Sequence, residues 1–235
     1  RCIDHPEAVK IPLNVGRCRE PQLEFVAQYP LLPHELFTYL FQHHREFFKE
    51  RFLPSNGDLS SFWDSQATNP QLDHRDPMGW ANTMRETCIP LRLHSGSVGH
   101  GGKVHGVWCK TLNVFSWGPV LGSGPTDTML YFIWTVWQHQ LSTNPDHHSY
   151  KAFGTLMRWS FTALWRGRWP THDHLGNAFE PGQRSYELSR GTGELADGYF
   201  ALLWVIESDL GFLASFWIFH VWIQRHLVRS VRVQM

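Results

Sequence analysis

The sequence lacks the short signatures that would assign an activity directly. Its four cysteines, Cys2, Cys18, Cys88 and Cys109, show no Cys-x-x-Cys spacing of the kind that holds zinc or supports redox chemistry. No signal-peptide pattern stands at the start, so we expect reduced thiols and an intracellular setting rather than a disulfide framework. The first residue is arginine rather than methionine, and we therefore expect a fragment or an excised domain.

Charge of one sign is not in excess. Lysine plus arginine and aspartate plus glutamate number 21 each, for a formal net charge of zero, so the global basic field of many nucleic-acid-binding proteins is missing. Local basic patches remain compatible with this balance. The 42% apolar and 18% charged content is typical of a globular chain. Twelve tryptophans and sixteen phenylalanines predict a large core, or an apolar surface that needs a partner.

The stretch Ile89–Lys103, "IPLRLHSGSVGHGGK", contains glycine, serine and histidine but matches no known phosphate-binding loop and no known metal-ligand spacing. Its glycines fit neither the G-x-G-x-x-G nor the G-x-x-x-x-G-K-[ST] phosphate loop. His94, His100 and His105 lie near one another, but zinc needs three or four converging ligands, and fifteen histidines in one chain produce such groupings by chance. "GSG" at Gly122–Gly124 lacks the G-x-S-x-G frame of a catalytic serine. We expect surface histidines and turn residues at these positions.

Hydrophobic periodicity predicts a chain of helices and strands. The polar run 65–77 offers no apolar face to bury and is the best linker candidate. We expect irregular backbone over 1–30, helices near 33–52, 59–64, 127–140 and 151–166, and strands near 88–94, 104–109, 111–117 and 200–207. These elements predict an α/β fold with a helical segment before the sheet.

The most apolar stretch covers residues 199–223. Its most continuous part, the fourteen residues Leu210–Ile223, holds no Asp, Glu, Lys or Arg and is interrupted by Ser215 and His220, and it is shorter than the about 17–25 residues of a membrane span. Extending it backwards meets Asp209 and Glu207, which are costly in a bilayer. A buried strand followed by a buried helix is the preferred interpretation, with a membrane-associated protein anchored through 199–223 as an alternative.

The predicted helix 151–166 combines an apolar face with positive charge. No acidic residue occurs in the sequence between Asp146 and Asp173. The basic residues there are Lys151, Arg158, Arg166 and Arg168. Such a face is usually solvated, but it can also contact the phosphates of DNA or RNA. A nucleic-acid-binding module that uses this helix is therefore a second alternative.

Six segments follow one another over most of residues 30–215: "LLPHELF", "FWDS", "IPLRLHSGSV", "VFSWGPVLGSGPT", "RWSFTALWRGRWPTHDHLG" and "LADGYFALLWVIESDLGFL". In order and spacing they resemble a large uncharacterised protein family multiplied in dinoflagellate genomes. That family in turn is similar to the catalytic core of CACTA-type DNA transposases, which have an RNase H-like fold. Composition and periodicity give an irregular segment over 1–30 and a helical segment with a linker over 31–77, and the resemblance implies an incomplete RNase H-like core over 78–213 and a tail over 214–235 that departs from the family pattern.

The resemblance also implies where catalytic acids would stand. Asp209, after the apolar "YFALLWVI", matches the second metal-binding aspartate, whereas the first position falls on Gly96, which has no side-chain oxygen. A third acid is expected beyond Met235. Two-metal strand transfer uses carboxylates that converge on two Mg²⁺ ions. The resemblance therefore implies a non-catalytic chain that needs no cofactor, although an intact relative would use Mg²⁺.

These observations together predict a non-catalytic, transposon-derived fragment whose intact relatives would be metal-dependent DNA strand transferases. DNA is the expected partner, no small-molecule substrate is evident, and the nucleus is the expected location of a transposase-like protein. If the analogy holds, strands 88–94 and 200–207 are adjacent and parallel. The Cα atoms of Gly96 and Asp209 then lie within roughly 10 Å, because carboxylates at both positions would share a pair of metal ions.

Overall fold

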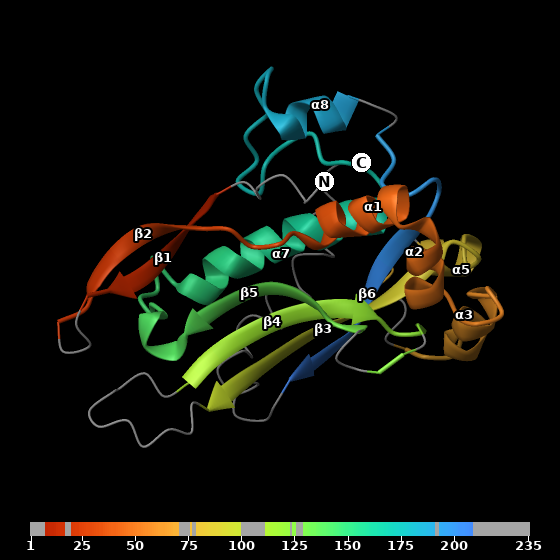
Figure 1. The fold of residues 1–235 in the computed structure, drawn as a ribbon, viewed down its shortest axis with the longest axis horizontal. Coiled ribbons are helices and arrows are strands. Elements are labelled where there is room, and N and C mark those ends of the chain that lie inside the picture. The colour runs from red at the N-terminus through yellow and green to blue at the C-terminus, as the bar shows by residue number, and fades with distance from the viewer. Residues whose placement is uncertain are drawn as a thin grey trace.

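The computed structural model describes residues 8–16, 20–70, 76, 79–99, 111–122, 124–125, 129–190 and 193–208. Its centre is a mixed four-stranded sheet in the order β5-β4-β3-β6. The four strands are β3 (Cys88–Gly99), β4 (Thr111–Pro119), β5 (Tyr131–Trp137) and β6 (Phe200–Ser208). Helices α1 and α7 lie across one face of this sheet (Figure 1). The expected α/β class is confirmed.

Strand directions in the sheet are mixed. β4 runs antiparallel to both β3 and β5, whereas β6 pairs with β3 in parallel. Because parallel neighbours need a long crossover, the chain passes from β5 through α7 (Ser149–Arg166) before it enters β6. The predicted strands 88–94, 111–117 and 200–207 are confirmed, as is the parallel pairing of the first and the last of them. The predicted strand 104–109 lies outside the described residues.

The predicted helix 127–140 is wrong. Tyr131–Trp137 forms strand β5, and a single 3₁₀ turn, η1 (Gln138–Gln140), follows it. A short run that is apolar nearly all round does not distinguish a buried helix from a strand by periodicity. The aromatic and β-branched content of "YFIWTVW" favours the strand, and pairing with β4 supplies the backbone hydrogen bonds.

The prediction of irregular backbone over residues 1–30 is also wrong. β1 (Val9–Val15) and β2 (Gln22–Gln28) form an antiparallel hairpin. Val9, Ile11 and Leu13 alternate toward the core and are buried, a period-2 pattern that the prolines and charges around it obscure. The hairpin is attached to the start of α7, where the Ser149 hydroxyl donates to the Pro12 carbonyl over 2.5 Å.

The predicted helix 33–52 is present but broken in two. α1 (Pro33–His43) begins with proline in its first turn, a position that needs no amide hydrogen. At His44 the backbone leaves the helical region, with φ −137° and ψ 51°, and α2 (Arg45–Phe52) then starts in a new direction. The bend brings Phe48 back onto Phe37, edge to face, with ring centroids 4.9 Å apart.

Helix α7 supplies the main core, as its predicted amphipathic pattern over 151–166 requires. Its buried face includes Phe153, Leu156 and Leu164, which belong to the same hydrophobic cluster as Leu91 and Leu93 of β3. Burying a large apolar side chain stabilises a fold by about 1.5–3 kcal/mol. The contact between α7 and the sheet therefore contributes several kcal/mol to the stability of the described structure.

A second hydrophobic cluster packs residues of α3 (Ser60–Gln66) and α5 (Trp80–Thr83) against the start of β6. Trp63 is buried in it, and its indole N–H donates to the Cys88 carbonyl over 2.8 Å. The predicted short helix near 59–64 is confirmed as α3. The predicted linker 65–77 is described only at 65–70 and 76, where it includes the end of α3.

The described part of the apolar stretch 199–223 belongs to the sheet. Phe200, Ala201 and Leu202 are buried strand residues of β6, and the positions from 209 onward lie outside the described residues. Within the described ranges, no helix is long and apolar enough to cross a membrane.

Gly122 lies where the segment after β4 meets the end of α2. A Cβ added there would fall against the backbone carbonyl of Arg51 and against the Met129 side chain. We expect Gly122→Ala to lower the free energy of unfolding by about 1–3 kcal/mol, because the backbone cannot move aside freely. Gly99→Ala is the matched control, since a Cβ there meets no atom within 4 Å. Equal urea-unfolding midpoints for the two variants would contradict this packing.

Candidate functional site

The first candidate site is the edge where the parallel strands β3 and β6 end side by side. The register pairs His94 with Glu207, and Gly96 stands two residues further along β3. Asp209, the predicted second acid, directly follows β6 in the sequence and lies outside the described residues. The short Gly96–Asp209 distance therefore stays a prediction, although the strand pairing on which it depends is present.

Few ligand atoms gather at this edge. Residues paired across neighbouring strands share one face of a sheet, so His94, Glu207 and Ser116 lie on the same side. His94 Nδ1 is 3.4 Å from the Ser116 hydroxyl, and Glu207 is 3.8 Å from the Arg92 guanidinium. No group of three histidine, cysteine, aspartate or glutamate side chains in the described part of the chain could hold a metal ion.

The second candidate site is a groove of about 700 Å³ on the outer side of α7. It lies between this helix and the segment 168–176 that follows it. Its basic residues are Arg158, Arg166 and Arg168, and its aromatic residues are Trp159 and Trp169. We call it the arginine groove. The structure thus brings together three of the four basic residues that the sequence singles out.

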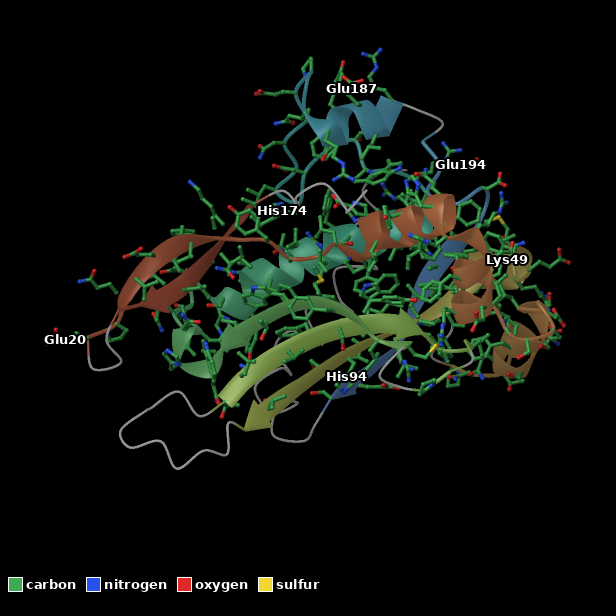
Figure 2. The ribbon with its side chains drawn as sticks, viewed as in Figure 1. Glu20, Lys49, His94, His174, Glu187 and Glu194 are labelled. Carbon is green, nitrogen blue, oxygen red and sulfur yellow. The ribbon has the colours of Figure 1, made fainter. Side chains whose placement is uncertain are left out.

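Lys151, the fourth predicted basic residue, lines a neighbouring hollow of about 640 Å³ between α7 and the β1–β2 hairpin. Lys10 of β1 and Phe25 of β2 also line this lysine hollow. Figure 2 shows His174 between α7 and the hairpin, whereas His94 lies on the opposite side of the sheet. The strand edge and the arginine groove are therefore separate sites.

A glycine turn shapes the arginine groove. α7 ends at Gly167, whose φ of 63° is a left-handed conformation that suits glycine. The amides of Gly167 and Arg168 donate to the carbonyls of Leu164 and Ala163 and close the last helical turn. The chain then folds back along α7, where the Trp159 indole N–H donates to the His172 carbonyl over 2.7 Å. This reversal places the segment 168–176 opposite the helix face.

Both tryptophans of the groove rest on a buried histidine from α1. The His34 ring meets Trp159 and Trp169 edge to face, with centroid distances of 4.8 and 5.3 Å. His34 Nδ1 and the Ser160 hydroxyl lie 2.8 Å apart and form a hydrogen bond. Complete burial lowers the pKa of His34 to about 3, so the ring is neutral near neutral pH. The indoles are thus held in place from beneath.

Asp173 is the acidic residue of the groove, and its oxygens hold its own loop together. Oδ1 accepts hydrogen bonds from the amides of Leu175 and Asn177, and Oδ2 accepts one from the Asn177 side chain. Partial burial acts to raise the pKa of Asp173, but these hydrogen bonds, together with the charge of His174, outweigh it and hold the pKa below its ordinary value. Beside it, burial lowers the pKa of His174 and the Asp173 charge raises it, with burial the larger effect. The arginines therefore dominate the charge of the groove at neutral pH.

The two tryptophans are functional candidates that the sequence analysis missed. Trp159 directly follows Arg158, and Trp169 directly follows Arg168. This repeated Arg-Trp pair is the signal that could have identified them, because arginine and aromatic side chains together are typical of surfaces that bind nucleic acids.

The buried His34 makes stability depend on pH. Its pKa is about 3 in the folded chain against an ordinary value of 6.5, so the unfolded chain takes up this proton first and stability is lost as pH falls below about 6.5. From about pH 7 to pH 5, we expect the chain to lose about 2 kcal/mol more unfolding free energy than His34→Asn. Urea unfolding at both pH values measures this difference, in which carboxylate effects common to both proteins cancel. Parallel pH profiles would contradict it.

The chain was also compared with known proteins. No family model, curated protein or solved structure matches it.

Proposed function

We propose that the protein is a non-catalytic, transposase-derived chain with an RNase H-like core, whose intact relatives would be metal-dependent DNA strand transferases. The observation that carries this proposal is the sheet order β5-β4-β3-β6, with β3 and β6 parallel and α7 between β5 and β6. The adjacent, parallel pairing of β3 with β6 is the part of this arrangement that the family resemblance implies.

In this proposal, the strand edge is the remnant of a two-metal site. The described β3–β6 register ends at Ser95 and Ser208, and the proposal extends it by one residue to Gly96 and Asp209, the two positions where the resemblance implies metal-binding acids. Gly96 supplies no side-chain oxygen, and Glu207 already faces the Arg92 guanidinium. A lone carboxylate leaves Mg²⁺ largely hydrated, and two-metal catalysis needs several carboxylates around both ions. In this proposal, the described part of the edge therefore has too few carboxylates for strand transfer.

Restoring the first acid tests this geometry. β3 is extended at Gly96, so aspartate fits the backbone. We expect the unmodified chain to bind Mn²⁺ only weakly and Gly96→Asp to bind it at least roughly tenfold more tightly by calorimetry, because two carboxylates then converge. Neither protein should cleave or join DNA.

Two controls accompany this experiment. Gly96→Asn matches the added volume without the charge and should not gain Mn²⁺ affinity, and Gly96→Asp with Asp209→Asn should lose the gain. Micromolar Mn²⁺ binding by the unmodified chain that Asp209→Ala abolishes would contradict the non-catalytic proposal. No gain in Gly96→Asp would count against the RNase H-like register.

A second candidate function is nucleic-acid binding through the arginine groove. The specific observation is the convergence of Arg158, Arg166 and Arg168 with two half-buried tryptophans around one hollow. Arginine binds phosphate through paired N–H donors. Burial lowers the pKa of Arg158, yet an arginine stays charged in proteins. This function is compatible with the first, since a transposase-derived chain can keep its DNA contacts after losing catalysis.

Charge removal tests the nucleic-acid interface. We expect replacement of Arg158, Arg166 and Arg168 by glutamine to weaken oligonucleotide binding at least tenfold in fluorescence anisotropy. The slope of log affinity against log salt concentration should become shallower by about two to three, because each phosphate contact contributes about 0.7–0.9.

The control variant also carries three substitutions of a basic residue by glutamine, but away from the groove, at Arg45, Lys49 and Arg190. Lys49 lies on α2, well away from His174 of the groove (Figure 2). Equal loss of affinity in both triple variants would indicate binding by overall charge and not by the arginine groove.

A further inference from the structure

We infer that the arginine groove and the lysine hollow form one continuous track for single-stranded nucleic acid, along which phosphates meet basic side chains and bases stack on aromatic rings. This inference rests on the proposed nucleic-acid binding and specifies its ligand and path. The two hollows adjoin, because His174 and Leu175 line both of them.

Helix α7 sets the length of the track. The α7 residues that line the two hollows recur at helical spacing on one face of the helix. They include Lys151, Thr155, Arg158, Thr162 and Arg166. From the first to the last the axis advances about 22 Å, at ~1.5 Å per residue. An extended ligand, and not a compact one, matches such a surface.

Charge along the track favours a polyanion. Its two acidic residues, Asp146 and Asp173, are outnumbered by basic residues. The basic residues are Lys10, Lys151, Arg158, Arg166 and Arg168. Spaced cations of this kind follow a phosphate backbone and bind it in a salt-dependent way. The net charge of the whole chain is zero, so this excess is local.

Aromatic rings stand at both ends of the track. Trp159 and Trp169 line the arginine groove and are only partly buried. At the other end, Phe25 of β2 is 56% exposed and its ring lies edge to face on His147, with centroids 5.4 Å apart. Removing the apolar surface of this ring from water would be favourable. Stacking on a base would cover it.

The combination of rings and cations distinguishes between kinds of polyanion. In a duplex, the bases are already stacked inside the double helix and present mainly phosphates to a groove. An acidic peptide offers carboxylates but no row of aromatic faces. A single strand offers both phosphates and unstacked bases, and stacking on aromatic side chains adds about 1–3 kcal/mol per base. The single strand is therefore the ligand that uses every feature of the track.

Binding of three matched ligands to the full chain tests the inference. They are a labelled oligothymidine of about eight nucleotides, the same strand in a duplex, and a base-free deoxyribose-phosphate oligomer of equal length. We expect the oligothymidine to bind at least roughly tenfold more tightly than the other two, because only it can stack.

A pair of protein variants tests the path. Phe25→Ser should weaken binding of the oligothymidine several-fold and leave binding of the base-free oligomer unchanged. Phe47→Ser is the control, since Phe47 is also exposed, at 38%, but lies on α2 away from the track. Circular dichroism of both variants confirms that the fold is kept.

The outcomes separate the inference from the function on which it rests. Equal or tighter binding of the duplex would overturn the single-strand inference and leave nucleic-acid binding in place. Equal binding of the base-free oligomer would show that the track recognises charge alone, which also overturns the inference. Failure of all three ligands to bind would contradict nucleic-acid binding itself.

Discussion

Parallel pairing between β3 and β6 is the constraint on which the rest of the structure depends. Two parallel neighbours cannot be joined by a tight turn, so the chain between them must cross the sheet, and it does so through α7. The inner face of α7 then fills the core against β3, and its outer face becomes the wall of the arginine groove. The same pairing brings the ends of both strands together at the opposite side, where the remnant acid site is proposed.

The sequence predicts those elements whose side chains repeat with a clear period. α7 and the strands β3, β4 and β6 are predicted because apolar residues recur at helical spacing or in short β-branched runs. β5 is mistaken for a helix, since an apolar run of its length fits both structures. The hairpin of β1 and β2 is missed because proline and charge hide its alternation. The break at His44 depends on packing between Phe48 and Phe37, which no local pattern reveals.

For the candidate sites, the sequence identifies residue types but not their neighbours. Arg158, Arg166 and Arg168 are recognisable as a basic group, and the structure places them around one groove. The hydrogen bond between His34 and Ser160 under that groove could not be predicted from the sequence, because the two residues are 126 positions apart. Tertiary packing alone brings His34 under the two tryptophans.

The glycine turn at Gly167 gives the arginine groove an unusual electrostatic setting. A helix carries partial negative charge at its C-terminal end, and α7 ends at this turn with Arg166 and Arg168 on either side of it. Most anion sites on helices use the opposite, positive end. The arginines here must first offset the dipole before they attract a phosphate. The helix dipole, equivalent to about half an elementary charge, offsets only part of the three arginine charges, so the groove stays electropositive at the negative end of a helix.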